Sequence, residues 1–211
     1  MTDDRRLLYR GGMLVAVAVL ASALAAPELP ARMATHWNAA GDVDGTMPTW
    51  LGLSLTPAVA ALTVGFFHVL PRLDPRNDYD DFRDAYDALA LATVGFVVYA
   101  HGFVLVVNLG VDVAPMQALA PALGGVYVVA GVVTARTDQN WFVGARTPWT
   151  LEDEGVWADT NRLVGRVLVA GGPVAAAGVL VPSYALALAV APAVLAAAAT
   201  VGYSYWRYRH A

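Results

Sequence analysis

Two polar segments carry most of the side chains in this sequence that could do chemistry. The first is HWNAAGDVDG at residues 36–45, whose polar and turn-forming residues are His36, Trp37, Asn38, Gly41, Asp42, Asp44 and Gly45. A histidine and two carboxylates are suitable ligands for a divalent cation, which makes His36, Asp42 and Asp44 candidate metal ligands. Asx and glycine residues are equally typical of turns. Three interpretations stay open: a metal site, a ligand-recognising or gating turn, and a plain structured turn.

The second polar segment is NWFVGARTPWTLEDEGVWADTNRLVGR, residues 140–166, which holds three of the six tryptophans. Thr150 followed by Asp153 predicts the start of a helix, because a threonine hydroxyl can accept from an amide one turn later. Acidic residues in the first turn favour the same start. We therefore expect a short helix from Thr150 along the membrane surface, bending into the next spanning helix, with Arg146 close to Glu152 or Glu154.

This segment has two interpretations. As a membrane-interface elbow, it would anchor Trp141, Trp149 and Trp157 at the depth of the lipid headgroups. An anchor needs only one or two directional hydrogen-bonding side chains, whereas the segment is dense in them. The surplus favours a binding role for the polar residues Asn140, Arg146, Thr147, Thr150, Thr160 and Asn161.

The elements around these segments are membrane helices. The chain is 58% hydrophobic, and five long runs contain no Asp, Glu, Lys or Arg: 11–27, 45–71, 88–111, 113–135 and 167–206. A bilayer core requires about 20 such residues per helix, so the last run is long enough for two crossings. The sequence predicts an all-α integral membrane protein, a bundle of six transmembrane helices at about 10–26, 50–70, 85–108, 115–135, 162–181 and 184–206.

Arginine placement predicts the orientation of the bundle. With the N-terminus and C-terminus both cytoplasmic, Arg32 alone of the thirteen arginines would lie outside. The cytoplasmic set would be Arg5, Arg6, Arg10, Arg72, Arg76, Arg83, Arg136, Arg146, Arg162, Arg166, Arg207 and Arg209. Positive residues flanking membrane helices remain inside. Residues 36–45 are therefore expected outside and residues 140–166 inside.

Composition excludes several classes of function. Without cysteine, the chain has no disulfide, thiolate metal site or cysteine nucleophile. A net charge of −4 argues against nucleic acid as a partner. The absence of lysine and the excess of Asp over Glu are typical of proteins from high salt, such as those of a halophilic archaeon. We expect no cofactor.

A few polar residues fall at membrane depth. His101 and Asn108 lie seven residues apart and so share one face of a helix, and His68 lies near the end of the preceding helix. Such groups usually face the bundle interior or a cavity. A packing role is favoured over a proton relay, but both stay open.

The two polar segments together resemble a known family. Residues 140–166 are similar to the hallmark of the SdpI family of membrane immunity proteins, roughly Asn-Tyr-Phe-x-Gly-x-Arg-Thr-Pro-Trp-Thr-Leu followed by Val-Trp and Thr-His. Upstream, LPARMATHWNAAGDVDGTMPTW resembles a small domain of unknown function commonly fused ahead of that hallmark, and LPRLDP also fits. The resemblance covers about residues 25–180. One departure is Asn161, which stands where the family commonly has histidine.

The resemblance implies a membrane protein that protects a cell against a secreted peptide toxin bound on the outer face. In some members the cytoplasmic face also sequesters a soluble repressor. The family residues carried over to the inner segment are Asn140, Gly144, Arg146, Thr147, Pro148, Trp149, Thr150, Trp157 and Thr160. The implied division is an N-terminal region, residues 1–110, with the outer loop, and an SdpI-like region, residues 111–211.

Two other classes of function, a transporter and an enzyme, make different demands on the sequence. A small-solute or ion transporter would use the polar groups of the second and third helices, among them His101 and Asn108, to line a path. An intramembrane enzyme would need a catalytic motif at membrane depth, and the sequence contains no HExxH, GxSxG or paired carboxylates there. The two polar segments are also expected on opposite faces, about 30 Å apart, so they could not form one active site. We expect no catalytic residue.

Overall fold

The computed structural model describes residues 3–74, 79 and 82–211. It contains six long helices: α1 (Asp3–Ala25), α2 (Thr49–Leu73), α3 (Arg83–Asn108), α4 (Pro115–Thr134), α6 (Glu154–Ala176) and α7 (Ala185–Arg209). The shorter elements are α5 (Pro148–Glu152), the 3-10 turns η1 (Ala26–Glu28), η2 (Ala177–Val179) and η3 (Pro182–Tyr184), and the strands β1 (Arg32–Trp37) and β2 (Val43–Pro48). The six long helices of the described chain are long and apolar enough to cross a membrane. The predicted six-helix membrane bundle is confirmed.

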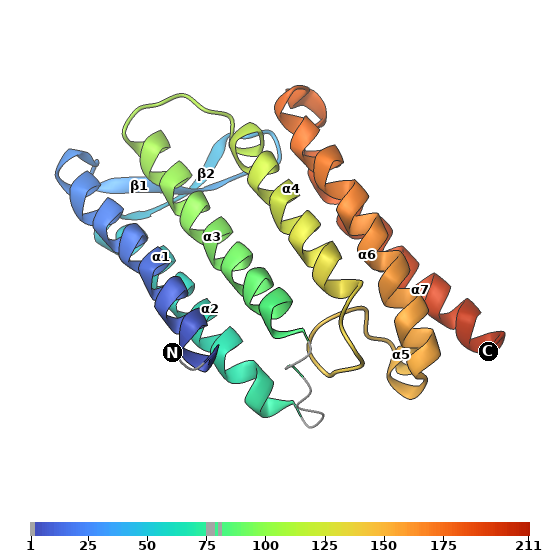
Figure 1. The fold of residues 1–211 in the computed structure, drawn as a ribbon. Coiled ribbons are helices and arrows are strands. Elements are labelled where there is room, and N and C mark those ends of the chain that lie inside the picture. Colours follow the sequence, from blue (N-terminus) through green and yellow to red (C-terminus); the bar gives the residue numbers. More distant parts are fainter. Residues whose placement is uncertain (1–2, 75–78, 80–81) are drawn as a thin grey trace.

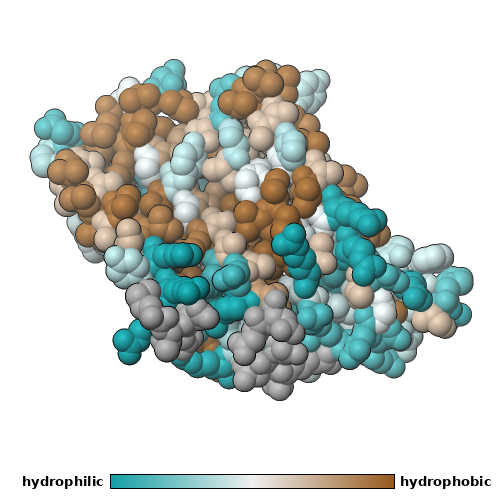
Figure 2. Space-filling model, viewed as in Figure 1, coloured by the Kyte–Doolittle hydropathy of each residue, from teal (hydrophilic) through white to brown (hydrophobic). Residues whose placement is uncertain are grey.

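The bundle has two distinct ends (Figure 1). At one end, which we call the hairpin end, lie β1 and β2; at the other, the loop end, lie residues 136–153 and both termini. Figure 2 shows hydrophobic side chains over the middle of the helices and many hydrophilic ones at the loop end. Arg32 lies in β1, whereas the other described arginines lie near the loop end. Arg76 falls outside the described residues.

The segment predicted as an outer loop forms a two-stranded antiparallel sheet. Trp37 pairs with Val43 and Met33 with Met47, and the register shifts on both sides of His36. The hairpin is fixed to α3 by Asn108, whose Oδ1 accepts from the Ala34 amide at 2.7 Å and whose Nδ2 donates to the Ala34 carbonyl at 2.9 Å. This amide side chain therefore satisfies the exposed backbone of an edge strand.

Helices α4 and α6 meet through glycines. A Cβ atom on Gly124 would lie 2.5 Å from the Gly172 carbonyl oxygen, and one on Gly131 would lie 2.6 Å from that of Gly165. Small residues allow membrane helices to approach this closely, where van der Waals packing stabilises the pair. The α4–α6 pair is thus the rigid support of the loop that connects the two helices.

The boundaries of the fifth spanning helix differ from the prediction. It was expected to begin at about residue 162, but α6 begins at Glu154, and the Asp153 carboxylate accepts from the Val156 amide at 2.8 Å as its N-cap. Residues 154–161, expected to belong to a separate surface helix, are the first two turns of α6, because hydropathy marks only the part of a helix that lies inside the lipid. Trp157 and Asn161 consequently lie on the spanning helix itself.

We expect Gly124→Ala to destabilise the bundle by about 1–3 kcal/mol, because the added methyl would force α4 away from α6. Gly125 is the matched control, since a Cβ atom there meets nothing within 4 Å. Gly125→Ala should be neutral or slightly stabilising, as alanine is the better helix former. Thermal unfolding of the detergent-solubilised protein measures both, and equal melting temperatures for the two variants would contradict the close contact.

Candidate functional site

Residues 136–153, which we call the signature loop, connect α4 to α6 by way of α5. Most of the polar residues predicted as binding residues are buried here or in the first turns of α6: Asn140, Thr147, Thr150, Trp157, Thr160 and Asn161. Buried polar groups must find hydrogen-bond partners. The contacts of five of them show what they do, whereas Thr160 is fully buried and its Oγ1 has no hydrogen-bond partner among the described residues.

Asn140 shapes the first half of the signature loop. Its Oδ1 accepts from the amides of Phe142 at 2.9 Å and Val143 at 2.6 Å. Its Nδ2 donates to the carbonyls of Asp138 and Val143, both at 2.9 Å. One side chain thus satisfies four backbone groups that have no partner in a helix or strand.

Asn161 holds the second half. Its Oδ1 accepts from the Ala145 amide at 2.6 Å, and its Nδ2 donates to the Trp157 carbonyl at 3.1 Å. Gly144 allows this approach: its φ is 113°, and a Cβ atom there would lie 2.6 Å from Asn161 Oδ1. Only glycine fits this backbone conformation and this space without strain.

Threonines form the start of α5, three residues earlier than predicted. Thr147 is the N-cap: its Oγ1 accepts from the Thr150 amide at 3.2 Å, while the Thr147 amide donates to Thr150 Oγ1 at 2.8 Å. This reciprocal pair is a capping box in which Thr150 replaces the usual Glu or Gln. Pro148 occupies the first helical position, where its missing N–H costs nothing. The Thr147 hydroxyl also donates to Ser204 Oγ at 3.1 Å, which ties the loop to α7.

The tryptophans have three different environments. Trp157 is only 2% exposed and its indole Nε1 donates to the Thr137 carbonyl at 2.8 Å, so its predicted role as a membrane anchor is wrong. Trp149 is half-buried, with its ring 5.0 Å from that of Tyr205 on α7. Trp141 is 49% exposed, as an anchor or a contact residue would be.

The connection between α2 and α3 also contacts the signature loop, which sequence reasoning did not anticipate. Asp74 is buried, and its Oδ2 accepts from the Trp141 amide and from the Tyr79 hydroxyl, both at 3.0 Å. Burial, and next the hydrogen bond to Asp74, raise the pKa of Tyr79 above its usual value, so the phenol stays protonated. The only available signal was LPRLDP, whose aspartate is Asp74.

Arg146 does not make the predicted ion pair. Its Nη1 donates to the Trp141 carbonyl at 2.8 Å, and the structure shows no ion pair with Glu152 or Glu154 among the described residues. The loop turns at Gly144, so the Arg146 side chain lies near the Trp141 carbonyl. Trp141, Arg146 and Pro148 are exposed in this part of the signature loop.

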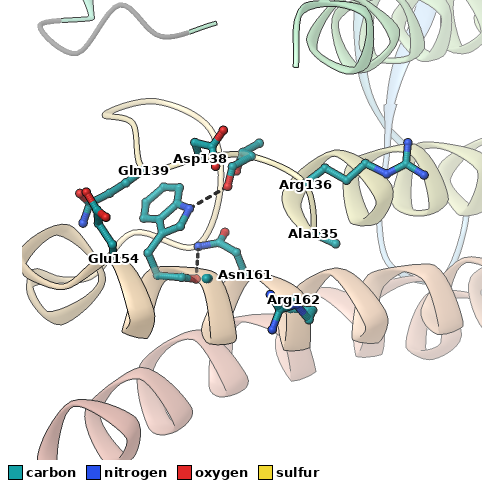
Figure 3. Close-up of a pocket in the computed structure, with 10 residues that line it drawn as sticks. Ala135, Arg136, Asp138, Gln139, Glu154, Asn161 and Arg162 are labelled. Carbon is teal, nitrogen blue, oxygen red and sulfur yellow. Dashed lines mark hydrogen bonds between the residues drawn. The ribbon is translucent and has the colours of Figure 1, made fainter. Parts of the chain in front are cut away.

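A polar pocket of about 760 Å³ lies between the end of α4, the signature loop and α6. Figure 3 shows Arg136 and Arg162 at the side nearest Ala135, with Gln139 and Glu154 at the opposite side. Asn161 faces the pocket between them. Thr137 also lines the pocket, and its buried Oγ1 has no hydrogen-bond partner among the described residues.

At the hairpin end, residues 36–45 comprise the end of β1, the turn and the start of β2. His36 Nδ1 lies 2.5 Å from Asp44 Oδ1, and both side chains are exposed. Asn38 Oδ1 accepts from the amides of Ala40 and Asp42, at 2.9 and 3.0 Å. Gly41 adopts a φ of 91°. Among the described residues, no three His, Asp or Glu side chains are grouped to hold a metal ion.

Two further residues of this segment, Trp37 and Gly45, have packing roles. The Trp37 ring lies 5.2 Å from that of Phe103 on α3. A Cβ atom on Gly45 would lie 2.8 Å from His36 Cβ, so glycine is required opposite the histidine. The His36–Asp44 pair and the Asn38 turn are therefore what the hairpin offers to a ligand.

The polar residues at membrane depth link helices. His101 Nε2 lies 2.7 Å from Ser22 Oγ, and the Ser22 hydroxyl donates to the Leu53 carbonyl at 3.0 Å. This network joins α1, α2 and α3. Asn108 binds Ala34, as described above, and His68 Nε2 lies 3.2 Å from Arg72 Nη1. These contacts are typical of packing residues, but His101 Nδ1 and His68 Nδ1 are buried without a hydrogen-bond partner among the described residues. Transport through this path stays a prediction.

Two family models match different parts of the chain. Residues 136–205 match the SdpI/YfhL protein family, and residues 13–61 match a domain of unknown function, DUF1648. The chain contains an SdpI/YfhL region. That region comprises the whole signature loop together with α6 and most of α7, and the DUF1648 region includes the hairpin.

A characterised relative is similar to the chain over a shorter stretch. The immunity protein SdpI of Bacillus subtilis (strain 168) is 37% identical over 68 residues, which are 32% of this chain and 33% of that protein. The match thus spans about a third of the relative's length. No solved structure matches the chain. Six apolar helices and the SdpI/YfhL region indicate a multi-pass membrane protein.

We expect Asn140→Ala to open the first half of the signature loop. The amides of Phe142 and Val143 would lose their acceptor, at a cost of about 1–3 kcal/mol. Hydrogen–deuterium exchange of those two amides should accelerate strongly in the solubilised protein. Asp138→Ala, at a neighbouring exposed position, is the control and should leave the exchange unchanged; acceleration in both variants, or in neither, would contradict the role of Asn140.

Asn161→His should preserve the loop at high pH and loosen it at low pH. A neutral imidazole can accept from the Ala145 amide, whereas a protonated one has no free lone pair. Stability is therefore full at high pH, where the ring is neutral, and is lost as the pH falls and the ring takes up a proton.

The measurement is the melting temperature as a function of pH, with the native asparagine as the flat reference. Asn161→Ala should be destabilised at every pH, since it supplies no acceptor at any pH. A histidine variant as insensitive to pH as the native chain would show that the Ala145 contact does not need an acceptor at this position.

Proposed function

We propose that this chain is a membrane immunity protein that protects its cell against a secreted peptide toxin. The observation that supports the proposal most is the SdpI/YfhL region, residues 136–205, together with its similarity to the B. subtilis immunity protein. The fold is compatible with such a role, because polar groups are gathered at the two ends of the bundle, where they can meet soluble partners.

In this proposal the hairpin end faces outward and the loop end faces the cytoplasm. The support is the arginine distribution, since all described arginines except Arg32 lie toward the loop end. The toxin then meets the hairpin, whose exposed His36–Asp44 pair and Asn38 turn provide directional contacts on a rigid support. Trp37 and Gly45 position that surface.

On the cytoplasmic side, we propose that a repressor protein contacts the exposed part of the signature loop. Trp141, Arg146 and Pro148 are exposed, and an aromatic ring beside an arginine is typical of binding hot spots. The buried residues Asn140 and Thr150 act on such a partner only through the shape that they give to this surface. The proposal assigns no catalytic residue to either end.

A survival assay tests the immunity function. The full chain is produced in a B. subtilis strain that lacks its own SdpI, and the strain is challenged with the toxin to which that protein confers immunity. We expect survival to rise at least about tenfold over the empty vector, and His36→Ala/Asp44→Ala to lower it because the hairpin surface is altered.

Asp112→Ala is the matched control, since Asp112 is exposed in the connection between α3 and α4 at the same end of the bundle. It should protect as well as the native chain. Unchanged killing of cells that carry the native chain in their membrane would contradict immunity against this toxin, and equal protection by all three chains would contradict a role for the hairpin surface.

A further inference from the structure

Two cavities, one polar and one mostly apolar, share Arg136 in their linings at the loop end of the α4–α6 pair. One is the polar pocket of Figure 3, in which Arg136 and Arg162 occupy one side. The other is a groove of about 370 Å³ between α4 and α6, lined by Gly131, Val132, Ala135, Arg136, Gly165, Arg166, Val169 and Ala170. Apart from its two arginines the groove is apolar, and it runs along helices that cross the membrane.

The charges at the head of this groove are not compensated within the described part of the chain. Arg136 and Arg166 are exposed, and neither guanidinium group has an ion-pair or hydrogen-bond partner among the described residues. Arg162 lies 3.3 Å from Asp159, but that carboxylate is held more closely by Arg207, at 2.8 Å. The result is a cluster of positive charge where the apolar groove ends.

A buried hydroxyl beside the cluster also has no partner. Thr137 lines the same pocket as Arg136 and is 6% exposed, and its buried Oγ1 makes no hydrogen bond in the described structure. Leaving such a group unsatisfied is unfavourable. A ligand oxygen held by the arginines would remove that cost, so the hydroxyl is an independent sign of a ligand.

We propose that the α4–α6 groove and its arginine cluster bind an anionic phospholipid. One acyl chain lies along the groove against Val132 and Val169, and the phosphate lies between Arg136 and Arg166, within reach of the Thr137 hydroxyl. Basic pockets between membrane helices bind anionic headgroups in this way, and guanidinium groups match the geometry of phosphate oxygens. Glu154 and Asp138 keep the anion at the arginine side by repulsion.

A lipid fits the groove better than a soluble anion does. The groove lies between two spanning helices, and its exposed residues Val169 and Ala170 belong to the apolar part of α6. Lipid chains therefore border it in the membrane, whereas free phosphate would use the arginines and leave the groove empty. The site is separate from the hairpin and the exposed loop surface, so it does not depend on the proposed immunity function.

The test is a titration of the full chain, purified and delipidated in detergent, with dioctanoyl phosphatidylglycerol, followed by native mass spectrometry. We expect saturable binding of one molecule, with dioctanoyl phosphatidylcholine bound more weakly. Arg136→Gln/Arg166→Gln should weaken binding by about tenfold or more. Arg136→Lys/Arg166→Lys keeps the charge and should recover most of the affinity.

The matched control is Arg5→Gln/Arg209→Gln, which removes the same net charge from exposed arginines at the same end of the bundle. Its affinity should stay within about twofold of the native value, because charges away from the groove act only through the screened surface potential. Equal loss in the two double variants would overturn the proposal, since the lipid would then be responding to overall charge.

Two further variants separate a lipid site from a phosphate site. Ala170→Trp fills the groove without changing the charge and should weaken phosphatidylglycerol binding while leaving inorganic phosphate unaffected. Thr137→Val should weaken lipid binding by about threefold to tenfold. The proposal fails if inorganic phosphate binds as tightly as the lipid, or if Ala170→Trp has no effect on the lipid.

Discussion

The structure of the signature loop depends on one constraint: backbone groups buried among the ends of membrane helices need partners inside the protein. The loop is too irregular to supply them from a helix or strand. Asn140 satisfies four backbone groups, and Asn161 and Thr150 satisfy most of the others near residues 145–147. Amide and hydroxyl side chains suit this task because they donate and accept without introducing a buried charge.

This constraint separates the family residues into two groups with different roles. The buried ones, such as Asn140, Thr147 and Thr150, fix the backbone, and through it they place Trp141 and Arg146 at the surface. The same division holds at the hairpin end, where Asn108 satisfies the edge strand and leaves the His36–Asp44 pair exposed. Substitutions of buried and exposed residues should therefore fail in different ways, the first through the fold and the second through binding.

The sequence predicted the six spanning helices well, because long uncharged runs have few alternative structures in a lipid bilayer. It predicted the local structure of the polar segments poorly. No pattern in the sequence predicts the two strands of the hairpin at residues 32–48, and its attachment to α3 comes from Asn108, which is distant in the chain. The pattern at Thr150 predicts a helix cap, although Thr147 is the cap and Thr150 its partner. Tryptophan is a typical membrane-anchor residue, yet the signature loop covers Trp157. No local sequence pattern predicts the contact between Asp74 and the Trp141 amide.

The central claim is that the hairpin and the signature loop lie on opposite sides of the membrane and therefore meet different partners. The chain contains no cysteine, so single cysteines report without background. Asp42→Cys and Asp138→Cys place a thiol at an exposed position of each end. With a membrane-impermeant maleimide on intact cells, we predict that the first is labelled at once and the second only after permeabilisation. Labelling of both in intact cells, or of neither, would contradict the account.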